Sequence, residues 1–101
     1  MPTQVLNPAQ RRYLKQLSHH LKPLLQIGKE GASQAFIRNL SEQIDIHELI
    51  KVRILGNCLA EDEEIRAALN AAGMTIVQKV GNIFTVFKQR EEDSKITLPR
   101  A

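Results

Sequence analysis

The stretch LLQIGKEGASQAFIRNL, residues 24–40, joins an apolar run to an amphipathic run through two glycines three residues apart. The apolar run between Pro23 and Gly28 is too short for a helix and is typical of a buried strand. Ser33, after the second glycine, is a favourable N-cap for a helix. Apolar residues follow at helical spacing, at Phe36, Ile37, Leu40 and Ile44. The stretch therefore predicts a strand, a glycine turn and a helix.

Residues 7–20 predict another helix upstream of this unit. Asn7 is a suitable N-cap, Pro8 suits the first helical position, and Gln10 stands where a capping-box partner belongs. Apolar residues recur at helical spacing, at Tyr13, Leu14, Leu17 and Leu21. The other side of this helix carries Arg11, Arg12 and Lys15 and no acid.

The segment HELIKVRIL, residues 47–55, alternates as a strand does. Ile50, Val52 and Ile54 share one face, while Lys51 and Arg53 share the other. A third helix follows, with acids in its first turn at residues 61–64 and Gly73 placed to end it. Two β-branched runs, MTIVQKV and IFTVFK, are joined at Gly81 and Asn82, which predicts a hairpin.

The predicted order is α-β-α-β-α-β-β, in the α/β class. Strand–helix–strand units favour parallel neighbours with right-handed crossovers, and the closing hairpin adds an antiparallel strand. We expect a four-stranded mixed sheet with helices packed mainly on one face. Residues 1–101 form one domain by size, and residues 89–101 form a polar tail in which ITLPR is the only apolar patch.

Composition excludes some classes of protein and favours others. The chain is 43% hydrophobic and 25% charged, as globular domains are, and no apolar run approaches the ~20 residues of a membrane span. The N-terminus lacks a signal-peptide pattern, and the single cysteine, Cys58, cannot form an internal disulfide. We therefore expect a cytoplasmic protein. A net charge of +3 permits a polyanionic partner without requiring one.

The glycine pair allows two interpretations. Gly28 and Gly31 precede a helix N-terminus, whose unpaired amides attract phosphate, and a GxxG loop clamps the nucleic-acid backbone in KH domains. The alternative is a plain tight turn that needs permissive residues. The segment is not a P-loop, because Lys29 is followed by Glu30 and not by Ser or Thr. It also lacks the third glycine of a dinucleotide-binding fingerprint. Glu30 would repel phosphate unless it points away, whereas nearby cations would attract it: Lys22, Lys29, Arg38, Lys51 and Arg53.

Catalytic and metal sites are not indicated. His19 and His20 are adjacent, so they point about 100° apart on a helix and cannot chelate as an i, i+4 pair does. No spacing places a base beside Ser33, Ser41 or Cys58. We predict no catalytic residue, metal or cofactor, and a protein that is not an enzyme. The few aromatic residues fit core positions better than base-stacking positions.

Three segments, HLKPLLQIGKEG, HELIKVRI and ITLPR, resemble the CRM domain (chloroplast RNA splicing and ribosome maturation), and most closely its bacterial stand-alone form, the YhbY family. The similarity extends from about Gln10 to Arg100. It implies a fold akin to the C-terminal domain of bacterial translation initiation factor three. It also implies RNA binding associated with precursors of the large ribosomal subunit. The RNA-contacting residues would be the loop Gly28, Lys29, Glu30 and Gly31, with Lys51 and Arg53.

The residues and the resemblance together predict an RNA-binding protein that contacts structured ribosomal RNA during large-subunit assembly. Loop amides would contact phosphates that Lys22, Lys29, Lys51 and Arg53 neutralise, with Arg38 nearby. The basic side of the first helix (Arg11, Arg12 and Lys15) would extend this surface. We expect a monomer that has no membrane partner, with ribosomal proteins as possible partners. The alternative is a protein-interaction module that docks on a ribosomal protein or assembly factor through the acidic start of the third helix and the ITLPR tail.

Overall fold

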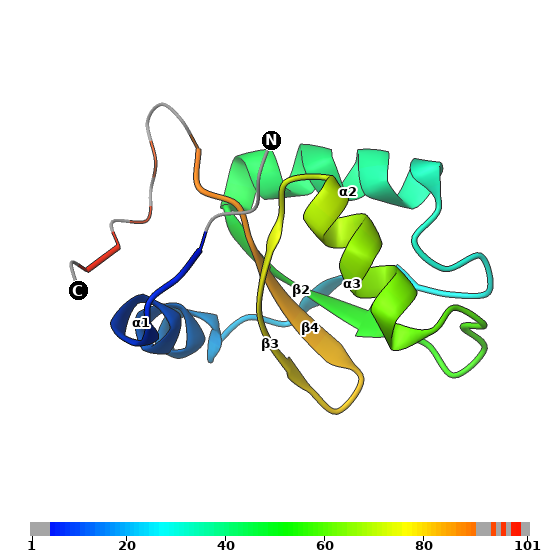
Figure 1. The fold of residues 1–101 in the computed structure, drawn as a ribbon, viewed down its shortest axis with the longest axis horizontal. Helices are drawn as coiled ribbons and strands as arrows, with labels where there is room; N and C mark the ends of the chain where they lie inside the picture. The colour runs from blue at the N-terminus through cyan, green and yellow to red at the C-terminus, as the bar shows by residue number, and fades with distance from the viewer. Residues whose placement is uncertain (1–4, 91–93, 95, 97, 100–101) are drawn as a thin grey trace.

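The computed structural model describes residues 5–90, 94, 96, 98 and 99 (Figure 1). The elements in chain order are α1 (Pro8–Ser18), β1 (Pro23–Ile27), α2 (Gln34–His47), β2 (Leu49–Ile54), α3 (Asp62–Ala71), β3 (Thr75–Val80) and β4 (Ile83–Phe87). The predicted order of helices and strands and the α/β class are confirmed.

The four strands form one mixed sheet in the order β1-β2-β4-β3. Strand β1 is parallel to β2, whereas β4 is antiparallel to both of its neighbours, β2 and β3. The last strand of the chain therefore lies inside the sheet, and β1 and β3 form its edges. Only Ile27 of β1 is buried, because an edge strand has a neighbour on one side alone.

Local capping agrees with the sequence. The Asn7 side chain accepts a hydrogen bond from the Gln10 amide at 2.8 Å, and the Gln10 side chain accepts one from the Asn7 amide at 3.1 Å. This reciprocal pair is the predicted capping box. Ser33 Oγ likewise accepts from the Phe36 amide at 3.2 Å and caps α2. Gly81 has a φ of 59°, a conformation suited to the tight turn between β3 and β4.

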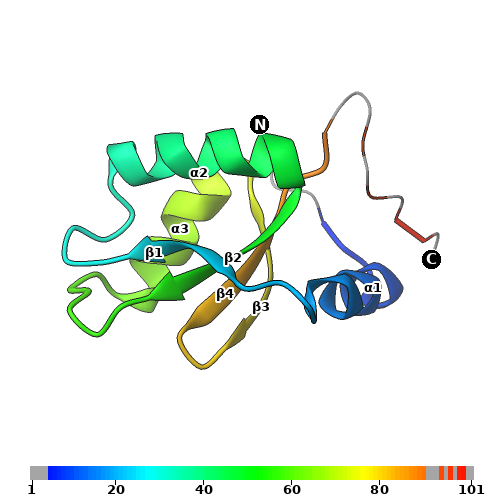
Figure 2. The same cartoon turned by 180° about the vertical axis from the view of Figure 1, so that it is seen from behind.

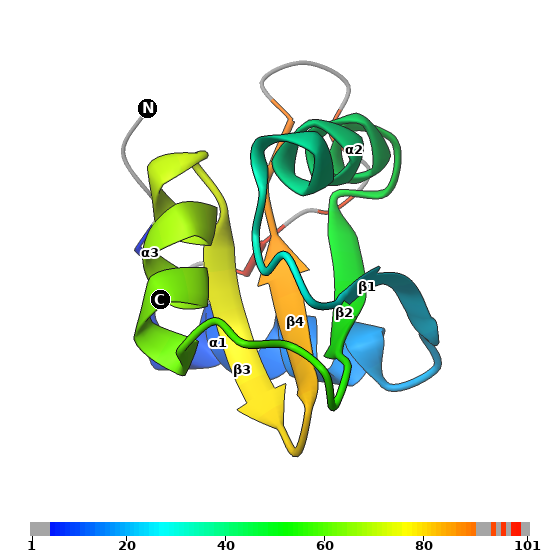
Figure 3. The same ribbon diagram turned by 90° about the vertical axis from the view of Figure 1, so that its right-hand side faces the viewer.

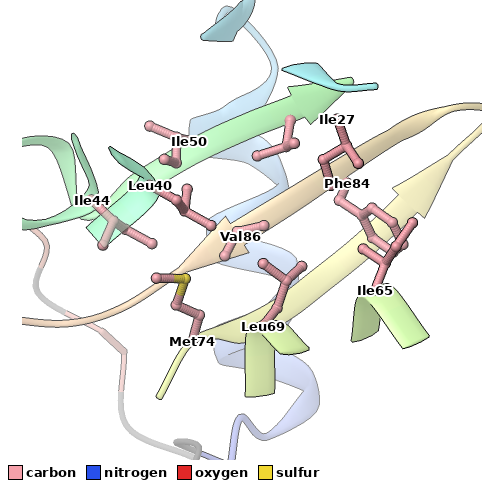
Figure 4. Packing of buried hydrophobic residues seen from close by; sticks show 10 residues of the cluster. Ile27, Leu40, Ile44, Ile50, Ile65, Leu69, Met74, Phe84 and Val86 are labelled. Carbon is pink, nitrogen blue, oxygen red and sulfur yellow. The ribbon is translucent and has the colours of Figure 1, made fainter. Parts of the chain in front are cut away.

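The main core lies between the sheet and the layer formed by α2 and α3 (Figures 3 and 4). Its side chains come from every strand, and the two helices cover the face to which Ile50 and Val52 point. The buried members are Ile27, Leu40, Ile44, Ile50, Val52, Ile65, Leu69, Met74, Phe84 and Val86. Two of the three helices thus share one face, as predicted.

A second cluster holds α1 against one end of the opposite face (Figure 2). It consists of Leu6, Leu14, Leu49, Val77 and Phe87. Two apolar residues of the tail, Ile96 and Leu98, pack against this cluster. The Gln10 side chain also donates a hydrogen bond to the Pro99 carbonyl at 3.1 Å. The described part of the ITLPR segment therefore belongs to the fold; its Thr97 and Arg100 lie outside the described residues.

The predicted apolar stripe of the first helix is wrong at its C-terminal end. Leu17 and Leu21 are 38% and 37% exposed, whereas Leu14 is fully buried. Helix α1 ends at Ser18, before Leu21, and packs on the sheet through Leu14 and Ser18. Within the described residues, no helix covers the half of the sheet beyond this end on the α1 side (Figures 1 and 2).

Candidate nucleic-acid interface

The GxxG segment is a tight turn that closes on itself. The Gly31 amide donates to the Gly28 carbonyl at 3.0 Å. Gly31 has a φ of +65°, and a Cβ added there would lie 2.9 Å from the Cβ of Ala60. A Cβ at Gly28 would lie no closer than 3.6 Å to Leu55, an ordinary contact. The backbone of the turn therefore requires glycine at position 31 but not at position 28.

The turn leaves few of its amides available to a ligand. The Gly31 amide is used within the turn, and the Phe36 amide is bonded to Ser33. Within the described residues, the amides of Lys29 and Glu30 have no protein acceptor. These two amides lie at the tip of the turn, just before the positive end of the α2 dipole.

An open hollow of about 260 Å³ lies beside the turn, and its lining consists of Gln26, Gly28, Lys29, Glu30, Gly31, Ser33 and Phe36. Both charged side chains of the turn, Lys29 and Glu30, are exposed. Their charges offset one another, so Lys29 alone gives the hollow no net positive charge. Attraction of a phosphate therefore depends on cations from neighbouring elements.

Strand β2 supplies the nearest such cations from the sheet. Arg53 pairs with Gln26 of β1 on one side and with Ile83 of β4 on the other. Lys51 lies two residues before it on the same face, opposite the face of Val52 and the main core. We call the area formed by Gln26, Lys51, Arg53 and Ile83 the open sheet surface. Gln26 also lines the GxxG hollow, whereas Lys51 and Ile83 also line a pocket that reaches Ser18 of α1. Figure 2 shows the loop after β1 and helix α1 at opposite ends of the molecule.

Charge is unevenly distributed between the two sides of the sheet. Residues 5–27, which include α1 and β1, carry four Lys or Arg residues and no acid. Neither Lys51 nor Arg53 has an ion-pair partner among the described residues. Six of the eight acids among the described residues lie in α2 and around the start of α3, at Glu42, Asp45, Glu61, Asp62, Glu63 and Glu64. The α1 side is thus the cationic side.

The remaining candidate cations are spread over the molecule. Lys22 precedes β1, whereas the glycine turn follows it, so the strand separates the two by about 16 Å. Arg38 is exposed in the first half of α2, and Arg12 and Lys15 are exposed on α1. The structure therefore places Arg53 beside Gln26, close to the turn. Lys51 pairs with Pro23, next to Lys22, towards the end of the sheet where Arg12 and Lys15 of α1 lie.

Arg11 has a structural role. Its Nη1 donates to the carbonyls of Ile76 and Val77, where β3 carries a register irregularity. These contacts satisfy acceptors at a sheet edge and hold α1 against β3. At least one nitrogen of the Arg11 guanidinium is therefore used within the protein.

Sequence reasoning missed a pocket on the α1 side of the sheet. Its volume is about 260 Å³, and it is lined by Ser18, His19, Lys51, Gln78, Val80, Ile83 and Thr85. The lining comes from α1 and from β2, β3 and β4. Only the strand order brings these segments together. Of the lining residues, the sequence reading included only Lys51 among the predicted contacts.

The acidic start of α3 is partly used within the fold. The Asp62 carboxylate accepts from Arg66 Nε at 2.6 Å and from Lys79 Nζ at 2.7 Å. Hydrogen bonds from Lys79 and Arg66 lower the pKa of Asp62 below its ordinary value of 3.8. Asp62 thus joins α3 to β3.

Two negative findings concern the described part of the chain. No group of three or more His, Cys, Asp or Glu side chains is arranged there to hold a metal ion. None of the helices described is both long enough and apolar enough to cross a membrane.

Comparisons with known proteins identify relatives of this chain and a similar fold. A Bacillus subtilis protein named Probable RNA-binding protein YqeI is 34% identical over 96 residues, covering 94% of this chain and 100% of the relative. A Haemophilus influenzae protein named RNA-binding protein is 33% identical, and the match covers 94% of this chain and 96% of the relative. The solution structure of hypothetical protein SAV1595 from Staphylococcus aureus matches with a TM-score of 0.76 and 32% identity, covering 94% of this chain and all of that one. The CRS1/YhbY (CRM) domain model matches residues 6–88. The chain therefore belongs to the CRS1/YhbY (CRM) domain family.

Proposed function

We propose that this protein binds RNA, and that its target is structured ribosomal RNA in the precursor of the large subunit. It acts without catalysis, as a cytoplasmic monomer, and ribosomal proteins are possible neighbours in the assembling particle. The names of its relatives support the RNA partner. The ribosomal target rests on the family resemblance.

The observation that carries this proposal is the position of Arg53. Its strand neighbour Gln26 lines the GxxG hollow, and its other neighbour, Ile83, lines the pocket near α1. Arg53 and Lys51 are exposed or half-buried cations without a carboxylate partner among the described residues. A backbone that crosses the open sheet surface would meet both of them.

The proposed contacts are mainly electrostatic. The tip amides of Lys29 and Glu30 donate to one phosphate, and the side chains of Lys29, Lys51 and Arg53 neutralise this phosphate and its neighbours. Arg38 and the exposed cations of α1 (Arg12 and Lys15), with Lys22, extend the contact for a longer RNA. Each neutralised phosphate lowers the slope of log affinity against log salt by about 0.7 to 0.9.

A salt titration tests the electrostatic mechanism. Binding of a large-subunit precursor RNA fragment is measured over a range of salt concentrations, with a small-subunit fragment of equal length as the control. We expect a slope of about −2 to −3 from three contacts and tighter binding of the large-subunit fragment. A flat dependence would exclude phosphate contacts, and equal affinity for both fragments would exclude the proposed target.

Gly28→Ala tests the turn in a folded protein. Its added Cβ meets no atom closer than 3.6 Å, so the fold is retained. The methyl group would nevertheless obstruct a backbone that approaches the turn closely. We expect weaker RNA binding with unchanged unfolding. If Gly28→Ala bound RNA as tightly as the unmodified protein, the glycine pair would serve only to form a tight turn.

The structure weakens support for a protein-interaction module. Ile96 and Leu98 of the tail, which that function would use for docking, pack against the second cluster. Asp62, in the acidic start of α3, is bonded to Arg66 and Lys79. A pull-down with and without nuclease separates the two functions, because a partner retained after RNA digestion would favour the protein module.

A further inference from the structure

We propose that the pocket beside α1 receives the base of one unpaired nucleotide of the bound RNA. This inference rests on the proposed function, and adds base recognition to a surface that otherwise contacts only phosphate. We call this cavity the α1 pocket; its lining is Ser18, His19, Lys51, Gln78, Val80, Ile83 and Thr85.

The lining of the α1 pocket combines two kinds of group that base recognition requires. Val80 and Ile83 present aliphatic surface, and a base taken out of a stack is held against aromatic or apolar side chains. Gln78 offers both a donor and an acceptor on one planar amide, which suits the edge of a base. His19 and Lys51 add polar groups from the helix and from the central part of the sheet.

These polar groups are available to a ligand. Among the described residues, none forms a hydrogen bond or ion pair with the side chains of His19, Lys51 or Gln78. Ser18, in contrast, donates its hydroxyl to the Lys15 carbonyl at 2.8 Å and takes no part in the proposal. Three unused polar side chains around a partly apolar hollow are typical of a specific small site.

Charge and continuity favour a nucleotide over a peptide as the occupant. No acid lines the α1 pocket, and Lys51 belongs both to it and to the open sheet surface. Arg53, two residues further along β2, lies beside Ile83 of the pocket wall. A chain whose phosphates lie along Lys51 and Arg53 thus places a neighbouring base at the pocket entrance.

The test uses the ¹⁵N-labelled full chain with short homopolymers of each of the four ribonucleotides. An abasic ribose-phosphate oligomer of equal length is the control that retains the charge. We expect the amides of Gln78, Val80 and Ile83 to shift with at least one homopolymer and not with the abasic oligomer. The amides of Lys29 and Lys51 should shift with both. Pocket shifts that are equal with the abasic oligomer, or absent with all homopolymers, would overturn the inference.

Gln78→Ala provides the second readout, with Gln16→Ala on the exposed part of α1 as its matched control. We expect Gln78→Ala to reduce the preference for the favoured base by about tenfold, with an unchanged salt slope. An unaltered preference, or no preference in the unmodified protein, would overturn base recognition while leaving phosphate binding intact. If the unmodified protein bound no RNA at all, the proposed function would be overturned as well. Failure of base recognition can therefore be distinguished from failure of RNA binding.

Discussion

Arg53 of β2 lies directly beside Gln26 of β1 in the parallel register, and both side chains point away from the main core. Gln26 lines the hollow of the glycine turn, whereas Ile83, on the other side of Arg53, lines the α1 pocket. One arginine therefore stands between two recessed areas on the cationic side of the sheet.

Replacement of this arginine should weaken RNA binding through charge alone. We expect Arg53→Ala and Lys51→Ala each to reduce the magnitude of the salt slope by nearly one, with little change in unfolding, because neither side chain has an ion-pair partner among the described residues. Lys79→Ala, on the α3 side, is the control and should leave the slope unchanged. An equal decrease in the magnitude of the salt slope in all three variants would indicate only a nonspecific effect of net charge.

Alanine at the two glycines should have unequal effects on stability. Gly31→Ala is expected to lower the free energy of unfolding by about 1–3 kcal/mol, because residue 31 has a positive φ and its new methyl would approach Ala60. Gly28→Ala should leave the free energy of unfolding nearly unchanged, because its new methyl would meet no atom closer than 3.6 Å. Denaturant unfolding of both variants measures the difference, and equal losses would show that the turn does not depend on the conformation of Gly31.

Asp62 should contribute a small, pH-dependent part of the stability. Its pKa is lowered by hydrogen bonds from Lys79 and Arg66, so the ionised form is favoured in the folded state. The contribution is present above the ordinary carboxyl pKa of 3.8 and is lost as pH falls through the lower folded value. Because the side chain is 40% exposed, we expect Asp62→Asn to cost less than about 1 kcal/mol at neutral pH.

Unfolding curves of Asp62→Asn and the unmodified protein should therefore converge as the pH approaches and passes below the folded pKa of Asp62. Glu63→Gln, at the neighbouring exposed position, controls for the loss of one negative charge. A difference that persists unchanged in strong acid would mean that Asp62 acts through packing and not through its charge.

Ser94 should hold the C-terminal tail in place. Its hydroxyl lies 2.6 Å from a carboxyl oxygen of Glu48 and 2.9 Å from the Ile96 carbonyl. Glu48 is fully buried and also accepts from the Arg90 amide at 3.0 Å. We expect Ser94→Ala to lower the free energy of unfolding by about 0.5–1.5 kcal/mol, since one hydrogen bond to the buried Glu48 side chain is lost.

Hydrogen exchange at Ile96 and Leu98 should increase in the same variant, because their anchor to Glu48 is gone. Ser41→Ala in α2 is the matched control. Unchanged protection of the tail in Ser94→Ala would show that apolar packing against the second cluster holds it without the hydroxyl.

Elements determined by neighbouring residues were predictable from the sequence. The capping box of Asn7 and Gln10, the Ser33 cap and the Gly81 turn each depend on residues that are close in the chain. The alternation of Lys51 and Arg53 with Val52 likewise specified which side chains point away from the core. These local rules gave the order of elements and the parity of the strands.

Features that depend on distant residues were not predictable in this way. The α1 pocket combines Lys51, Gln78 and Ile83, whose proximity follows only from the insertion of β4 between β2 and β3. The bond between Arg11 and the β3 carbonyls depends on the position of α1 over an irregular edge strand. A basic residue directed at the protein has the same sequence pattern as one directed at RNA.

The inner position of β4 affects how the chain reaches its native state during synthesis. Strands β2 and β3 have no hydrogen bonds with each other, and each pairs with β4. The four-stranded sheet therefore cannot form until residues 83–87 have been synthesised. A ribosome-bound chain that ends before Ile83 would expose apolar strand edges to other nascent chains. Closure of the sheet is therefore delayed until almost the whole domain has left the exit tunnel.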